Sequence, residues 1–172
     1  MSNYRLIEGA AQLAVSPEHR SSSAARDLSV AILAARFNEP VVAPMIQAAV
    51  DAWQRHGGDP ARVTVIRVPG AFELPLAAKQ FAESRRYDCL VALGCVIRGD
   101  TPHFEYVAGA AASGISQAAY DTGVPIAFGV LTVETLEQAV ERASPDKMNK
   151  GAEALETAIE MALLLRQTTS NE

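Results

Sequence analysis

The segment from Cys89 to His103, CLVALGCVIRGDTPH, decides the fold of this chain. Its first part, Cys89–Cys95, is an apolar run that predicts a buried strand, and the Ala-rich residues after the polar turn predict a helix to about Tyr120. A strand that leads through a polar turn into a helix N-terminus exposes free N–H groups and the positive end of the helix dipole, which favours an anion. His103 adds a side chain that exchanges protons near neutral pH. The same residues also fit a capped helix with a surface histidine.

The alternation of strand and helix continues on both sides of this segment. Further strands are predicted at Leu28–Ala35, Arg62–Val68 and Val124–Leu131. The expected helices run from Asn38, as N-cap with Pro40 in the first turn, to Gly57, from about Pro75 to Ser84, from Leu136 to Ala143 and from Lys150 to Gln167. Connections of helical length require parallel strands. The predicted fold is therefore α/β, a three-layer α/β/α sandwich with a central four-stranded parallel sheet.

The composition narrows the classes of function. The chain has 172 residues, of which 49% are hydrophobic and 20% charged, with a formal net charge of −5. A nucleic-acid surface would need clustered Lys and Arg, so no nucleic-acid partner is expected. There is no apolar run near the ~20 residues of a membrane span and no signal-peptide pattern, which predicts a cytoplasmic protein without a membrane partner. Two cysteines, ~20 Å apart on one strand, and three histidines predict neither a disulfide nor a metal site.

Residues 1–27 differ from the rest and are interpreted as an N-terminal arm before a domain at 28–172. Tyr4–Gly9 has the pattern of a short strand, and Ser16–Arg26 is polar. The short strand has no evident partner within its own domain, so we expect it to be added to the sheet edge of a neighbouring copy. The sequence therefore predicts a homo-oligomer.

Ligands of parallel sheets bind at the carboxyl ends of the strands. Four loops are expected there: Phe37–Asn38, Gly70–Glu73, Val96–His103 and, near the last strand, Phe128. Two aromatic side chains beside polar groups favour stacking on a flat ring, although each alone fits ordinary packing.

Glu73 is interpreted either as an acceptor for a polyhydroxylated ligand or as a surface acid favoured by the helix dipole. Arg142 and Lys150 either close over a phosphate or are solvated cations at helix ends. The chain has no Gly-rich nucleotide-binding motif, which disfavours a nucleoside triphosphate or a dinucleotide.

Several blocks, taken together, resemble the signature of the lumazine synthase family. They are Arg36–Asn38, Pro69–Pro75, Gly94–Val107, Phe128–Thr132, Glu141–Ala143 and Asn149–Gly151. The resemblance extends from Leu28 to the C-terminus, whereas Ala10–Asp27 is longer and more polar than the usual lead-in of the family.

The resemblance implies a flavodoxin-like fold and a transferase of riboflavin biosynthesis. This family condenses 5-amino-6-(D-ribitylamino)uracil with 3,4-dihydroxy-2-butanone 4-phosphate to 6,7-dimethyl-8-ribityllumazine, without cofactor or metal. It implies that Phe37 stacks on the pyrimidine and that His103 transfers protons. It further implies that Ala71, Phe72 and Glu73 hold the ribityl chain, that Cys95, Val96 and Ile97 meet the uracil edge, that Asp100, Thr101, Arg142 and Lys150 serve the phosphate, and that Phe128 comes from a neighbouring subunit.

The same resemblance implies pentameric rings, with riboflavin synthase as a partner. The hinge Ser144–Met148 has no long insertion, which favours assembly of pentamers into an icosahedral shell of sixty. Two alternatives stay open on the sequence: an archaeal-type riboflavin synthase and a non-catalytic protein that binds flavin or a phosphorylated ligand. His103 together with Arg142 and the Glu73 block favours the condensing enzyme, since amine addition, phosphate loss and ring closure need only proton transfer.

Overall fold

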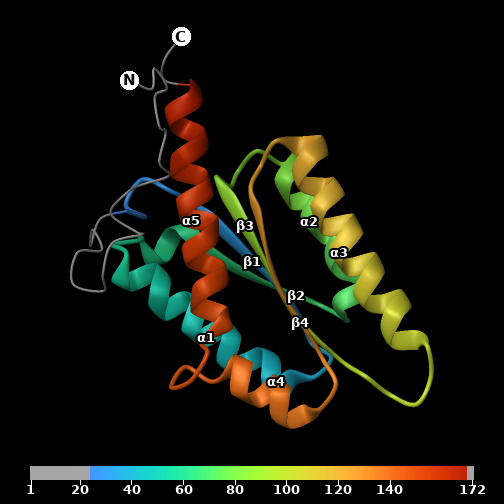
Figure 1. Ribbon diagram of the computed structural model, residues 1–172. Helices are drawn as coiled ribbons and strands as arrows, with labels where there is room; N and C mark the ends of the chain where they lie inside the picture. Colours follow the sequence, from blue (N-terminus) through green and yellow to red (C-terminus); the bar gives the residue numbers. More distant parts are fainter. Residues whose placement is uncertain (1–23, 170–172) are drawn as a thin grey trace, which may run out of the picture.

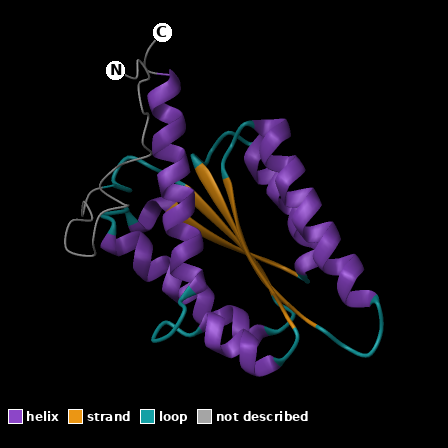
Figure 2. Cartoon of the chain, viewed as in Figure 1, coloured by secondary structure: helices purple, strands orange, loops and turns teal. Residues whose placement is uncertain are grey.

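A four-stranded parallel sheet forms the middle layer of the computed structural model, which describes residues 24–169 (Figure 1). Its strands, β1 (Val30–Ala35), β2 (Val63–Val68), β3 (Cys89–Ile97) and β4 (Ile126–Val133), lie in the order β2-β1-β3-β4. One face is covered by α1 (Glu39–Arg55), α4 (Leu136–Ala143) and α5 (Lys150–Thr169), and the other by α2 (Leu74–Glu83) and α3 (His103–Thr122) (Figure 2). The predicted α/β/α sandwich is confirmed, with element ends shifted by a few residues.

The two central strands are apolar on both sides because they supply two separate cores. On β1, Val30, Ile32 and Ala34 pack toward α1, α4 and α5. The alternate residues Ala31 and Leu33 pack toward α2 and α3. Successive side chains of a strand point to opposite faces, so every β1 residue is buried.

Asn38 is the N-cap residue of α1 as predicted, but its side chain makes no capping hydrogen bond to the helix. Its backbone is left-handed, with φ 60°, and its carbonyl accepts from the amides of Val41 and Val42. The side-chain Nδ2 donates instead to the carbonyl of Cys95 at 2.8 Å. The amide group therefore ties the loop after β1 to the end of β3.

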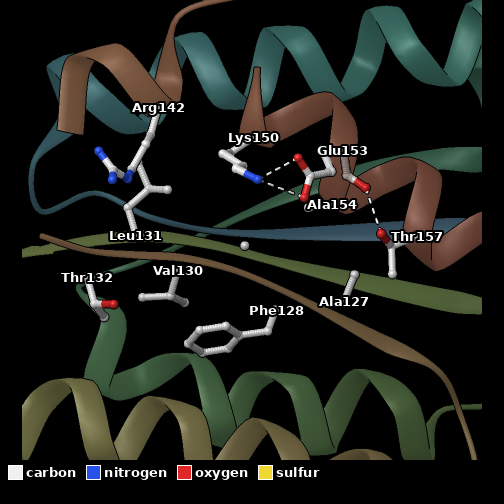
Figure 3. A pocket seen from close by; sticks show the side chains of 11 residues that line it. Ala127, Phe128, Val130, Leu131, Thr132, Arg142, Lys150, Glu153, Ala154 and Thr157 are labelled. Carbon is white, nitrogen blue, oxygen red and sulfur yellow. Dashed lines mark hydrogen bonds and ion pairs between the residues drawn. The ribbon is translucent and has the colours of Figure 1, made fainter. Parts of the chain in front are cut away.

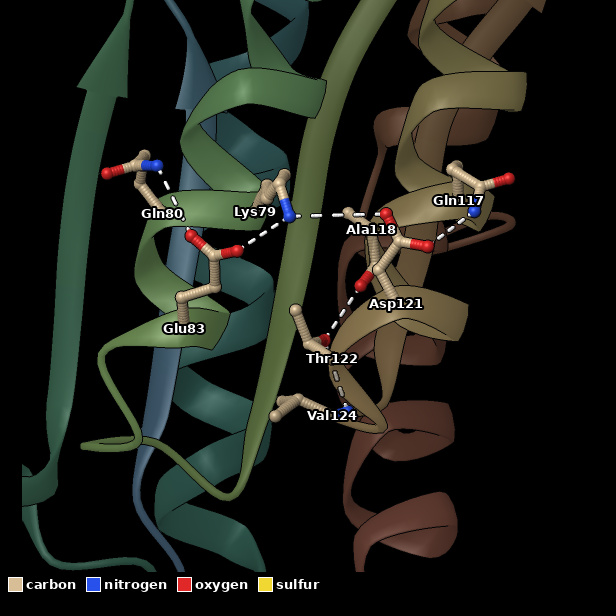
Figure 4. Close-up of polar contacts among 8 residues, drawn as sticks. All are labelled: Lys79, Gln80, Glu83, Gln117, Ala118, Asp121, Thr122 and Val124. Atoms are coloured by element: carbon tan, nitrogen blue, oxygen red, sulfur yellow. Dashed lines mark hydrogen bonds and ion pairs between the residues drawn. The ribbon is translucent and has the colours of Figure 1, made fainter.

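Helices α2 and α3 lie against each other along the opposite face (Figure 4). Near the middle of α3, Gly114 leaves room for Pro75, because a Cβ at Gly114 would lie 2.6 Å from the Pro75 ring. At the far end, Lys79 Nζ is 4.0 Å from Asp121 Oδ2. The hydroxyl of Thr122 donates at 2.7 Å to the carbonyl one turn before it. These contacts fix α3 along its length, and with it the position of His103 at its N-terminus.

The N-terminus of α5 is pressed against α1. A Cβ at Gly151 would lie 2.2 Å from the carbonyl oxygen of Met45, so the two backbones touch at a glycine. At the other end of α1, the amide of Ala25 donates to the carbonyl of His56 at 2.8 Å.

The predicted strand Tyr4–Gly9 lies outside the described residues. No helix within residues 24–169 has the length and apolar character needed to cross a membrane.

Candidate active site

The first pocket lies where β1 and β3 end and α3 begins, and its volume is about 590 Å³. Phe37 and Phe72, both more than half exposed, contribute aromatic rings to it. Large exposed aromatic side chains around a cavity are typical of a site for a ligand or a partner. The lining residues are Phe37, Asn38, Gly70, Ala71, Phe72, Glu73, Cys95, Val96, Ile97, Gly99, Thr101, His103, Phe104, Tyr106 and Val107.

The end of β3 exposes backbone groups to this pocket. Pairing of β3 with β1 stops at Leu93, whereas pairing with β4 continues to Ile97. Within residues 24–169, no strand therefore pairs with the β1 side of the last β3 residues, and the Asn38 side chain occupies only the carbonyl of Cys95. Backbone N–H and C=O groups that lack a strand partner are well suited to the donor and acceptor edge of a flat heterocycle.

Cys95 contributes to the pocket as a small neutral group. Burial raises the pKa of its thiol to about 11, so the thiol stays protonated at neutral pH. A thiol that stays protonated is a poor nucleophile. The structure thus agrees with the interpretation of the cysteines as packing residues.

The turn from β3 into α3 brings His103 to the pocket as the first residue of the helix. Its amide lies 3.5 Å from the hydroxyl of Thr101, which also lines the pocket. Asp100 is exposed between the lining residues Gly99 and Thr101 and does not itself line the cavity. The helix N-terminus beside an aromatic cavity combines an anion-binding end with a proton-transfer group.

A second pocket of about 300 Å³ runs along β4, the edge strand of the sheet (Figure 3). Phe128 and Thr132 reach it from β4, and Arg142 and Lys150 reach it from α4 and α5. The complete lining is Ala127, Phe128, Gly129, Val130, Leu131, Thr132, Arg142, Lys150, Glu153, Ala154 and Thr157. Two cations in a pocket that Phe128 also lines make it suitable for a phosphorylated ligand.

The two cations differ in how they are paired. Lys150 Nζ lies 2.9 and 2.6 Å from the two carboxylate oxygens of Glu153, which compensates its charge. Arg142 Nη1 donates only to the carbonyl of Gln138 at 3.1 Å, and within residues 24–169 no carboxylate forms an ion pair with it. Arg142 therefore keeps its charge and most of its donors available, and it is the stronger candidate for a phosphate contact.

Known proteins of one family are similar to this chain over most of its length. A family model described as 6,7-dimethyl-8-ribityllumazine synthase matches residues 27–166. The chain belongs to this family. Proteins of that name from two strains of Thermus thermophilus are 57% identical over 141 residues, which cover 82% of this chain and 90% of theirs. The one from Chlorobium luteolum is 51% identical over 142 residues, which cover 83% of this chain and 92% of its own.

Membership of the lumazine synthase family confirms the recognition made from the sequence blocks. It makes the chain a transferase of riboflavin biosynthesis with a flavodoxin-like α/β fold. Family membership favours a lumazine synthase over an archaeal-type riboflavin synthase and over a non-catalytic protein that binds flavin or a phosphorylated ligand.

Within one chain, the residues expected to form the lumazine synthase site, apart from Asp100, are divided between the two pockets. Phe37, Ala71–Glu73, Cys95–Ile97, Thr101 and His103 share the first pocket. Phe128, Arg142 and Lys150 share the second, and no residue lines both. The expectation that Phe128 lies at the carboxyl edge of the sheet is wrong. It is the third residue of β4, level with Ala92 in mid-β3, because β4 continues to Val133.

Some lining residues were not predicted, although the sequence carries a signal for them. Tyr106 and Val107 follow His103 by three and four residues, so all three share one face of α3. Glu153 and Thr157 follow Lys150 by three and seven residues on α5 in the same way. Helical spacing from an already suspected residue would have identified them. Residues 24–169 contain no group of three His, Cys, Asp or Glu side chains placed to hold a metal ion.

Proposed function

We propose that this protein condenses 5-amino-6-(D-ribitylamino)uracil with 3,4-dihydroxy-2-butanone 4-phosphate, and that each active site is built from two subunits. The observation that carries the second part is the division of the expected site residues between two separate pockets. The first pocket has the aromatic rings, the backbone edge and His103. The second has Phe128 and the two cations.

Joining the first pocket of one subunit to the second pocket of its neighbour completes the site. Phe37 and Phe128 then contribute aromatic faces from two chains, and Arg142 brings positive charge toward the N-terminus of α3. A pentameric ring, which the family resemblance implies, forms five such interfaces with one repeated contact. The proposal also includes a cytoplasmic location, riboflavin synthase as a partner, and assembly of rings into a shell.

In this arrangement the chemistry is carried by positioning and by proton transfer. The amine of the pyrimidine attacks the ketone and water leaves to form an imine; phosphate is then eliminated, and the ring closes with loss of a second water. His103 transfers protons at the helix N-terminus, and Thr101, Arg142 and Lys150 hold the phosphate. Holding two substrates together supplies a large part of the acceleration, since effective molarities in well-oriented pairs reach ~10⁵ M or more.

The first test is an assay of the purified protein with both substrates. We expect the lumazine absorbance to appear together with one phosphate per turnover. Riboflavin formed from the lumazine alone would identify a riboflavin synthase instead. Binding of lumazine without turnover of either kind would identify a non-catalytic binding protein.

The shared site is tested by mixing two impaired variants within one assembly. His103→Ala damages the first pocket and Arg142→Ala the second, and the latter alone should raise the KM of the phosphorylated substrate more than that of the pyrimidine. In a ring with random, equal incorporation, about one interface in four joins two intact halves, so activity should recover to about a quarter of wild type. Recovery no greater than the sum of the single variants would show that each chain carries a whole site.

A further inference from the structure

The Arg98 guanidinium connects three elements beside the first pocket. Its Nε donates to Glu134 Oε2 at 2.7 Å, and its Nη1 pairs with the carboxylate of Glu105 in the first turn of α3. Its Cζ lies 4.2 Å from the centre of the Phe104 ring, which lines the pocket. The backbone amide of Arg98 donates to the carbonyl oxygen of Val133 at 2.9 Å. One side chain thus joins the end of β3, the start of α3 and the segment that follows β4.

This cluster is too exposed to add much to the stability of the fold. The side chains of Arg98, Glu105 and Glu134 are 39%, 53% and 58% exposed. Exposed ion pairs contribute little, because water screens them and side-chain entropy opposes them. The geometry nevertheless requires an arginine, since only a planar guanidinium can stack on a ring while donating to two carboxylates. Hydrogen bonds with the two carboxylates raise the pKa of Arg98 further, so its charge is permanent.

The residues after Arg98 have few constraints of their own. A Cβ at Gly99 would meet no atom within 4 Å. Among the described residues, the side-chain hydrogen bonds of positions 99–103 amount to one long contact, from the His103 amide to the Thr101 hydroxyl at 3.5 Å. The shape of this loop is therefore set at its two ends. Arg98 holds both ends, at the close of β3 and at Phe104 and Glu105.

We propose that Arg98 is a positioning residue for the phosphorylated substrate. It fixes the loop 99–103 so that the loop amides and His103 face the phosphate, and it does not touch the substrate itself. Through Glu134 it also connects this loop to β4, whose free edge carries the second pocket. The proposal rests on the proposed function, because it assigns the loop to the phosphate of that reaction.

The kinetic test compares Arg98→Gln and Arg98→Lys with wild type. Arg86→Gln is the matched control, since Arg86 is also exposed and stacked on an aromatic ring, Tyr87, at the opposite end of the sheet. For Arg98→Gln we expect the KM of the phosphorylated substrate to rise about tenfold, with the KM of the pyrimidine within about twofold and the melting temperature within about 2 °C. For Arg98→Lys we expect a smaller rise in the KM of the phosphorylated substrate, because lysine keeps the positive charge but cannot stack flat on the Phe104 ring. An equal rise in both KM values, or none, would overturn the proposal.

Hydrogen exchange gives a readout that does not depend on turnover. Amides in the peptide spanning 98–106 should exchange faster in Arg98→Gln than in wild type, and at the wild-type rate in Arg86→Gln. Unchanged exchange in Arg98→Gln would overturn the positioning role even in an active enzyme. If the wild-type protein makes no lumazine but Arg98→Gln still exchanges faster than wild type, the proposed function is refuted. The positioning of the loop 99–103 by Arg98 then still stands.

Discussion

Replacing Gly151 by alanine should force α5, which lines the second pocket, away from α1. The added Cβ would lie 2.2 Å from the Met45 oxygen, 2.7 Å from its Cα and 2.8 Å from its carbonyl carbon, all of them backbone atoms. No side-chain rotation can relieve a clash with backbone, so α5 has to shift from α1. Overpacking of this kind costs about 1–3 kcal/mol. For a domain of this size that corresponds to a fall in melting temperature of about 3–10 °C.

The measurement is thermal unfolding by calorimetry or circular dichroism at one fixed protein concentration. Gly109→Ala is the control, because Gly109 is also helical but a Cβ there would meet nothing within 4 Å. Alanine should stabilise that position by up to about 1 kcal/mol through helix propensity. The shift should also displace Lys150, the neighbour of Gly151, and weaken binding of the phosphorylated substrate. A Gly151→Ala protein that melts at or above the wild-type temperature would refute the close contact between α5 and α1.

Two further predictions concern His103 and Cys89. His103→Ala should slow turnover by ~10²-fold or less, and unchanged turnover across pH 6 to 8 would remove His103 from proton transfer. Burial raises the pKa of the Cys89 thiol from its ordinary value near 9 to about 12, so the unfolded chain loses this proton before the folded one does. Stability from this group is therefore complete below about pH 9 and declines as the pH rises toward 12. Cys89→Ala should melt with a shallower decline between pH 9 and 11, and a slope equal to wild type would contradict this linkage.

Local pattern explains why the fold could be predicted from the sequence. The runs at Val30–Ala35 and Cys89–Ile97 are apolar on both faces, which only a covered central strand allows. Helix α3 ends at Gly123, with φ 69°, close to Tyr120, where the sequence predicted the helix end. The amide of Asn38 could not be placed in the same way, because its partner Cys95 lies 57 residues further along the chain. No periodic pattern reports a contact between a side chain and a distant backbone carbonyl.

The sequence predicted many of the residues that line the two pockets, but not how the structure divides them between the pockets. Phe37 and His103 follow strands whose ends meet, so their proximity follows from the topology. By resemblance, Arg142 was expected at the phosphate and Phe128 was expected from a neighbouring subunit. Within one chain, the two residues line a separate cavity along the outer edge of β4. The register between β4 and β3 determines on which face of β4 a residue such as Phe128 lies. That register is fixed by packing and not by local sequence.

The strand order also determines what happens while the chain is being synthesised. Among the four strands of this sheet, β1 leaves the ribosome first, yet it occupies an inner place in the sheet and pairs with both β2 and β3. About 60 residues separate the end of β1 from the end of β3, which at ribosomal rates amounts to about 3–12 s. During that interval α1 covers one face of the six apolar residues of β1. The edge of β1 that later pairs with β3 has no strand beside it. A nascent chain that has not reached Cys89 therefore presents an apolar strand whose β3 edge is unpaired, which makes chaperone binding most useful at this stage of synthesis.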